Sequence, residues 1–226
     1  MSREGTGEND RRIYLNMIPV KICGITNLKD AMHVSEAGAK AIGFIFYNKS
    51  PRCITIDRAS KISKEINNMI KIGVFVNPHL DLVNEAIKKV PIDIIQFHGN
   101  ETDAFINSFN IPKIKVIKVK DNIEDFFEFN NTLLFDTYSN TSEGGTGRAF
   151  NWNLLNHYKK QNFILSGGLN NGNILKAIST VNPGAIDICS GLEKKPGHKC
   201  HQKVNEFFQK IKNTKETEFD FAKLSN

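Results

Sequence analysis

The stretch VKICGIT, residues 20–26, opens the regular part of this 226-residue chain and introduces the pattern on which its fold depends. Val20–Ile25 reads as a short apolar strand with Cys23 near its end, and a turn is expected at Gly24. Two interpretations of Cys23 stay open on this stretch alone. It is either a small buried hydrophobe, as free cysteines commonly are, or a thiol at the mouth of a site, where nearby charge lowers its pKa.

The same order of apolar strand, turn and amphipathic helix recurs along the chain. Strands are predicted at residues 20–25, 41–46, 71–76, 93–98, 113–119, 132–137, 163–168 and 185–191. Helices are predicted at residues 27–38, 57–68 (with Asp57 as the N-cap), 79–90, 101–109, 151–161, 171–181 and 200–212, with one or two helical turns at 123–130.

Apolar strands that alternate with helices require a parallel sheet covered on its outer face. Eight such units predict an α/β fold, a single-domain (β/α)8 or TIM barrel. The competing architecture is a doubly wound open sheet. A dinucleotide-binding sheet of that kind would be expected to carry GxGxxG after its first strand, and CGIT does not match it.

The composition is that of an ordinary globular protein, with 40% apolar and 24% charged residues. The net charge of +6 is scattered along the chain, so no nucleic-acid partner is expected and an anionic small molecule fits better. Four cysteines without a CxxC pair indicate reduced thiols and a cytoplasmic location. No apolar run reaches the length of about 18 residues that a membrane span needs.

Three parts of the chain differ in composition. Residues 1–16 predict an N-terminal extension without the apolar run of a signal peptide. Residues 17–212 contain all the predicted strands and helices, and therefore the barrel. Residues 213–226 predict a polar, loosely held tail.

Polar and reactive side chains collect where the strands end, which is the end of a barrel that carries active sites. Those singled out are Cys23, Arg52, His98, Asp136, Ser166, Asp187 and Ser190. Core packing alone would not gather them there. Arg52 follows Ser50 and Pro51 just past a strand end, where a planar guanidinium suits a carboxylate. His98 is expected to line the site as a hydrogen-bonding group, since no acid partner is evident in the sequence.

Glycine-rich loops follow three of the last strands. The loops contain Gly145, Thr146 and Gly147 after the sixth strand, Gly167 and Gly168 after the seventh, and Gly191 after the eighth. Glycine lets the backbone N–H groups approach an anion closely, and barrels commonly bind phosphate after strands seven and eight. The three loops together predict a phosphate site. His198, Cys200 and His201 lack a fourth ligand nearby and predict a surface cluster and no metal site.

Taken together, these motifs resemble the phosphoribosylanthranilate isomerase family of tryptophan biosynthesis. The matching stretches are VKICGITNLKDA, GFIFYNKSPRCI, IGVFVN, IIQFHGNE, LLFDT, GGTGRAFNW, LSGGLNNGNI and IDICSGLEKKPGHKCHQKV. They cover residues 20 to about 212 in the expected order. The combination of KICGIT with the YxKSPR loop, QFHG and GGTG is highly specific.

The resemblance implies a cofactor-free aldose–ketose isomerisation, an Amadori rearrangement of N-(5-phosphoribosyl)anthranilate. It implies Cys23 as the general base, Asp136 as the general acid and Arg52 as the ligand of the anthranilate carboxylate. The substrate-binding set is completed by His98, Asp187, the glycine-loop residues named above with Ser166 and Ser190, and Lys21, which lies on the same strand face as Cys23 and is the nearest cation to bias it. The partner is the phosphorylated substrate, and the protein is expected to be a monomer or a homodimer.

The sequence departs from the family pattern in a few places. Asn48 stands where proline is usual, Phe97 where leucine is usual, and Cys189 where serine is common. Two alternatives remain: the sister phosphosugar isomerase of histidine biosynthesis, which favours two aspartates over a cysteine, and a non-catalytic barrel that binds a phosphorylated ligand.

Overall fold

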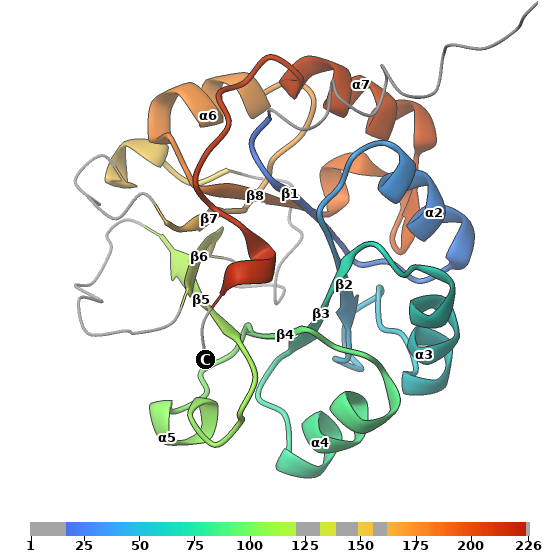
Figure 1. Ribbon diagram of the computed structural model, residues 1–226. Coiled ribbons are helices and arrows are strands. Elements are labelled where there is room, and N and C mark those ends of the chain that lie inside the picture. The colour runs from blue at the N-terminus through green and yellow to red at the C-terminus, as the bar shows by residue number, and fades with distance from the viewer. Residues whose placement is uncertain (1–16, 121–131, 139–148, 156–161, 225–226) are drawn as a thin grey trace, which may run out of the picture.

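The computed structural model describes residues 17–120, 132–138, 149–155 and 162–224. Eight parallel strands follow one another around a closed barrel, and the last pairs with the first (Figure 1). They are β1 (Val20–Cys23), β2 (Ala41–Ile45), β3 (Ile70–Phe75), β4 (Ile94–Phe97), β5 (Lys113–Val119), β6 (Thr132–Thr137), β7 (Ile164–Leu165) and β8 (Ala185–Ile188). The predicted (β/α)8 barrel is confirmed, and the open doubly wound sheet is wrong because β8 closes onto β1.

Helices surround the barrel and cover the outer face of its strands (Figure 1). The described helices are α2 (Leu28–Glu36), α3 (Ile56–Glu65), α4 (Leu80–Lys89), α5 (Asp103–Ile106), α6 (Ile174–Val181) and α7 (His201–Ile211), with short 3-10 helices η1 (Trp152–Leu155), η2 (Ser190–Leu192) and η3 (Phe221–Lys223). A small antiparallel pair, β9 (Glu193–Lys195) and β10 (His198–Lys199), precedes α7. No helix in the described ranges is long and apolar enough to cross a membrane.

Some predicted boundaries are wrong for local reasons. The N-cap of α3 is Thr55 and not Asp57, because the Thr55 side chain accepts a hydrogen bond from the backbone N–H of Arg58 at 3.3 Å. Strand β7 is shorter than residues 163–168, since Gly167 and Gly168 have φ of +88° and +63°, outside the strand region. Of the predicted helix at 151–161 only the turn η1 is described; residues 156–161 and the turns predicted at 123–130 lie outside the described residues.

The barrel has two apolar layers. Large side chains between the strands and the helices form the outer core, as in the contact of Phe135 with Phe163 and that of Phe46 with Phe75. Branched and small residues from the inward-facing positions of the strands fill the interior, among them Ile72, Ile94, Ile114, Leu134, Ile164 and Ala185. The period of two along each strand separates the layers.

The C-terminal segment is part of the barrel core. Phe219 and Phe221 are 6% and 2% exposed, pack edge to face, and join the interior cluster. Figure 1 shows this segment, in red, crossing the barrel opening at the centre of the view. The predicted loosely held tail therefore does not describe residues 219–221, because two phenylalanines among polar neighbours pack against the barrel interior.

Helix α7 docks against α2 through two histidines. The rings of His33 and His201 stack with centroids 3.9 Å apart, and His201 Nε2 lies 2.9 Å from Asp30 Oδ1. Asp30 also accepts a hydrogen bond from the backbone N–H of Lys199. The His201 ring thus contributes to helix packing.

Candidate active site

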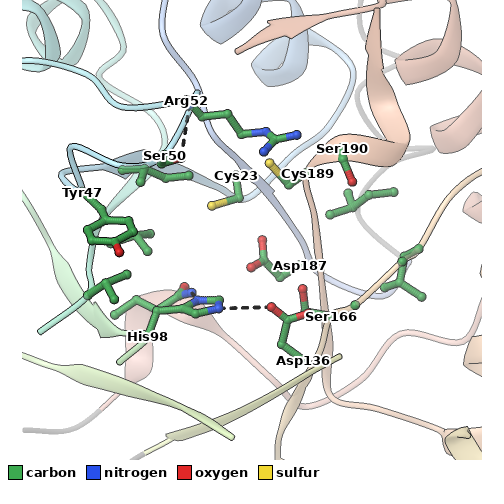
Figure 2. Close-up of a pocket in the computed structure, with 18 residues that line it drawn as sticks. Cys23, Tyr47, Ser50, Arg52, His98, Asp136, Ser166, Asp187, Cys189 and Ser190 are labelled. Atoms are coloured by element: carbon green, nitrogen blue, oxygen red, sulfur yellow. Dashed lines mark hydrogen bonds and ion pairs between the residues drawn. The ribbon is translucent and has the colours of Figure 1, made fainter. Parts of the chain in front are cut away.

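A cavity opens at the carboxyl ends of the barrel strands (Figure 2). Its polar lining comes from Cys23, Tyr47, Ser50, Arg52, Gln96, His98, Asp136, Ser166, Gly167, Gly168, Asp187, Cys189 and Ser190, and its apolar lining from Ile45, Val74, Val76, Leu169 and Ile188. Successive strands contribute side chains to one space because parallel strands in a barrel all end at the same face.

The structure brings most of the predicted site residues together. Cys23, Arg52, His98, Asp136, Ser166, Gly167, Gly168, Asp187 and Ser190 all line the cavity. Lys21 and Gly191 are absent from the lining; Gly191 instead packs so closely on the Leu169 carbonyl that a side chain would collide with it. Gly145, Thr146 and Gly147 lie outside the described residues.

Asp187 lines the cavity, and Lys21 lies beneath it. They are register partners on β1 and β8, and Lys21 Nζ donates a hydrogen bond to Asp187 Oδ2 at 2.9 Å. The Lys21 side chain is fully buried. Although burial alone would lower it, the charge of Asp187 raises the pKa of Lys21, so the lysine stays protonated. Lys21 is thus buried behind Asp187 and does not line the cavity, and its predicted role in substrate binding stays a prediction.

Cys23 lies at the end of β1, directly above this pair. An interaction with the Cys189 thiol and burial raise the pKa of Cys23 well above its ordinary value, while the charge of Lys21 acts in the opposite sense. Lys21 thus favours ionisation of the Cys23 thiol, as predicted, but the interaction with Cys189 and burial outweigh its effect on the pKa. The Cys189 thiol has a pKa lowered to about 7 by Cys23 first and by the charge of Lys199 as well. The two shifts have opposite directions, so Cys189 ionises before Cys23.

Asp136 ends β6 and faces His98, which follows β4. His98 Nε2 lies 3.2 Å from Asp136 Oδ2, and the other carboxyl oxygen accepts a hydrogen bond from the backbone N–H of Thr137 at 2.8 Å. Gln96 Nε2 lies 3.4 Å from His98 Nδ1. His98 thus has an acid partner that its neighbours in sequence did not reveal. Figure 2 shows Asp136 and His98 on the side of the cavity away from Arg52.

Arg52 is held in place by Glu193, the first residue of β9. Its Nε donates to both carboxyl oxygens at 3.0 Å, and its Nη2 donates to Oε2 at 2.8 Å. Lys199 Nζ donates to the same carboxylate at 3.2 Å. Burial opposes ionisation of Glu193, but these hydrogen bonds and charges hold its pKa below the usual value. A bidentate arrangement of this kind fixes the guanidinium plane.

Gly24 lets Arg52 approach β1. Its φ is +73°, and a Cβ at this position would lie 2.9 Å from both Arg52 Cδ and Cys189 Sγ. A side chain would push both residues away from the cavity. The glycine after the cysteine in VKICGIT is therefore needed for conformation and for space.

Four residues in or next to the cavity lining were not among the predicted site residues. Glu193 and Lys199 lie in the segment after β8 and are 141 and 147 positions from Arg52 in the chain, so no local pattern connects them to it. Tyr47 and Gln96 sit beside predicted residues at strand ends, and that position is the signal that could have found them. Among the described residues, no three His, Cys, Asp or Glu side chains are grouped to hold a metal ion.

Sequence comparison relates the chain to proteins of known activity. The family model described as N-(5'-phosphoribosyl)anthranilate (PRA) isomerase matches residues 20–210. A relative named N-(5'-phosphoribosyl)anthranilate isomerase from Legionella pneumophila is 39% identical over 201 residues, covering 86% of this chain and 97% of the relative. A relative of the same name from Hahella chejuensis is 42% identical over 197 residues, covering 84% and 92%.

Solved structures of isomerases with the same name also resemble this chain. The crystal structure of phosphoribosyl anthranilate isomerase from Thermotoga maritima has a TM-score of 0.80 and 37% identity, covering 87% of this chain and 99% of that one. A complex of such an isomerase with reduced 1-(o-carboxyphenylamino)-1-deoxyribulose 5-phosphate has a TM-score of 0.76 and 36% identity, with the same coverage. A third structure, with a TM-score of 0.76, 35% identity and again the same coverage, is of monomers generated from the dimeric T. maritima isomerase.

Proposed function

The chain belongs to the N-(5'-phosphoribosyl)anthranilate isomerase family, and we propose that it catalyses this family's step of tryptophan biosynthesis with Cys23 as general base and Asp136 as general acid. The substrate is N-(5-phosphoribosyl)anthranilate and the product 1-(2-carboxyphenylamino)-1-deoxyribulose 5-phosphate. The observation that carries the proposal is a single cavity that offers a thiol, a carboxyl group and an arginine from separate strand ends.

The first step is opening of the furanose ring. The amine nitrogen pushes out the ring oxygen to form an iminium ion, and that oxygen needs a proton as the C–O bond breaks. Asp136 is suited to deliver it, since its carboxyl group faces the cavity at 6% exposure. His98, 3.2 Å away, is suited to orient the carboxyl group during the transfer.

The second step removes the proton from carbon 2. The iminium ion accepts the electron pair from the broken C–H bond, which gives an enolamine that rearranges to the ketone. Cys23 takes the proton as a thiolate. The charges of Lys21 and Arg52 favour this thiolate, whereas the interaction with Cys189 and burial raise the pKa of Cys23 and oppose it.

Two anchors hold the substrate at its ends. Glu193 occupies the Nε and Nη2 edge of Arg52, so we place the anthranilate carboxylate at Nη1. The phosphate lies across the barrel on the loops after β7 and β8, where Gly167, Gly168 and Ser190 face the cavity. Gly145, Thr146 and Gly147 complete this cradle in the proposal.

We also propose a domain organisation, an assembly state and a cellular location for the chain. Residues 17–212 would form the catalytic domain, with residues 1–16 as an extension, in line with the family match over 20–210. The protein would act as a monomer or a homodimer in the cytoplasm, without nucleic acid or membrane as a partner. Sedimentation velocity tests the assembly state, and a trimer or larger species would contradict it.

Loss of anthranilate fluorescence measures the reaction, with the substrate made in situ. Cys23→Ala and Asp136→Asn should each lower kcat by about 10²-fold or more, the usual contribution of acid–base catalysis, while a reduced product analogue still binds. The matched control is Cys53→Ala, since Cys53 is exposed and free. Turnover near that of the control in either variant would overturn the assigned role.

A further inference from the structure

Cys23 and Cys189 occupy matching positions on neighbouring strands. β1 and β8 run parallel with Ile22 opposite Ile188, so the next residues along the two chains are the two cysteines. Neighbouring strands lie about 4.8 Å apart. That separation falls within the Cα–Cα range of about 4.4–6.8 Å that a disulfide can span. Both residues line the cavity, where Figure 2 shows them below the Arg52 guanidinium.

The space around the two sulfur atoms allows them to meet. Cys189 Sγ reaches over Gly24, where an added Cβ would lie only 2.9 Å from it. Cys23 Sγ leans the other way, toward β2, and lies 2.8 Å from the place that a Cβ of Gly43 would take. The two side chains already interact, and a change of χ1 between staggered positions is the movement by which a cysteine sulfur changes neighbours. Because Gly24 has no side chain, nothing on that residue blocks the movement.

The charges around Cys189 favour its reactive form. Lys199 Nζ lies 3.9 Å from Cys189 Sγ, and Lys199 is itself fully buried. Cys23, Lys199 and Arg52 together lower the pKa of Cys189 to about 7, against the effect of burial. A substantial fraction of this thiol is therefore ionised near neutral pH, and the thiolate is the form that attacks a peroxide.

We propose that Cys23 and Cys189 form a redox-sensitive dithiol, which hydrogen peroxide converts to a disulfide that reversibly disables the site. The Cys189 thiolate attacks one peroxide oxygen, and the O–O bond breaks. Hydroxide is the leaving group, and Cys189 becomes a sulfenic acid. The Cys23 sulfur then attacks this sulfenyl sulfur, the S–O bond breaks, and the oxygen leaves as water with the Cys23 proton. The two thiols lose two electrons and peroxide gains them.

The functional consequence rests on the proposed role of Cys23. A sulfur atom in a disulfide cannot ionise to a thiolate and is too weak a base to take the proton. The oxidised site therefore lacks its base. A thiol reductant restores both thiols, because the second cysteine captures the sulfenic acid before it reaches the irreversible sulfinic state. Cys189 is thus the thiol that peroxide oxidises, and Cys23 is the thiol that resolves its sulfenic acid.

The test treats the full chain with hydrogen peroxide and maps its peptides without reduction. A peptide joining residues 23 and 189 should appear in step with an activity loss that reaches about 10²-fold or more at full cross-linking, the scale of a lost general base, and dithiothreitol should reverse both. In Cys189→Ser, assayed relative to its own untreated activity, the same peroxide treatment should cause little loss, because the thiolate that attacks peroxide is missing. Cys53→Ser is the matched control and should behave as the wild type does.

The peptide map and the activity separate the two proposals. Inactivation of the wild type without the 23–189 peptide, or with only Cys53 or Cys200 cross-linked, overturns the dithiol. If the cross-link forms fully while activity is retained, the dithiol stands and the assigned role of Cys23 as base is overturned. The wild-type map decides the dithiol even if Cys189→Ser fails to fold.

Discussion

Arg52 and Glu193 are joined by three hydrogen bonds of 2.8–3.0 Å. The Arg52 guanidinium, which lines the cavity, is therefore oriented by a carboxylate 141 positions away in the chain. The pair is nearly buried, with side chains 10% and 4% exposed. The guanidinium is thereby positioned before a ligand arrives, which lowers the entropic cost of binding one.

Glu193→Gln should therefore weaken substrate binding more than it slows chemistry. Loss of a charged hydrogen bond is worth about 1.5 kcal/mol, so KM should rise about tenfold while kcat changes much less. Arg52→Lys should act in the same direction because an ammonium lacks the planar fork. Steady-state kinetics measure the effect. The control is Lys49→Met, an exposed residue of the same loop. A fall in kcat at unchanged KM would contradict the anchoring role.

The same pair should make stability depend on pH. The folded-state pKa of Glu193 is depressed below its ordinary value of 4.5, so this carboxylate stabilises the fold above about pH 4.5. The contribution is lost as pH falls through the lower, folded value. Urea unfolding at a series of pH values should show the free energy of unfolding declining there. Glu193→Gln should flatten that part of the curve, and an unchanged slope would remove Glu193 as the cause.

Lys21 and Asp187 form a second buried pair, which should be costly to break. Lys21→Met leaves the Asp187 carboxylate without its cation and should lower the free energy of unfolding by about 3–5 kcal/mol. The double variant Lys21→Met with Asp187→Leu should recover most of this loss, because no unpaired charge remains. Removing the exposed ion pair of Lys89 and Glu85 should change stability little. A double variant no more stable than Lys21→Met would show that charge pairing is not the cause.

The C-terminal phenylalanines should stabilise the barrel without affecting catalysis. Phe221→Ala removes a ring that is 2% exposed, and should lower the free energy of unfolding by about 3 kcal/mol. Because Phe221 packs at the end of the barrel away from the cavity, KM and kcat at low temperature should stay unchanged. Leu175→Ala is the control, since Leu175 is 49% exposed. A change in KM with stability intact would place the segment in the site.

Much of the fold could be predicted from local patterns. The segments 113–119 and 132–137 were predicted with the bounds that the structure shows, because each is rich in residues that favour strands and is preceded by a residue that disfavours them, Pro112 or Asn131. Strand β7 was overestimated, since the apolar pattern of residues 163–168 does not reveal that Gly167 turns the backbone away. The role of Phe219 and Phe221 was missed because a short polar segment with two aromatic residues resembles an unstructured end.

The sequence by itself determined the order of strands and helices, the barrel, and the end of it that carries Cys23, Arg52, His98 and Asp136. Those features follow from periods of two residues in strands and 3.6 residues in helices, which are local and can be read directly from the sequence. Only the tertiary structure decided which side chains meet. The contacts of Arg52 with Glu193, of His98 with Asp136 and of Cys23 with Cys189 arise when the strands assemble into the closed barrel and bring distant residues together. In VKICGIT the cysteine and the glycine were visible from the start, but the Cys189 thiol that raises the pKa of Cys23 was not.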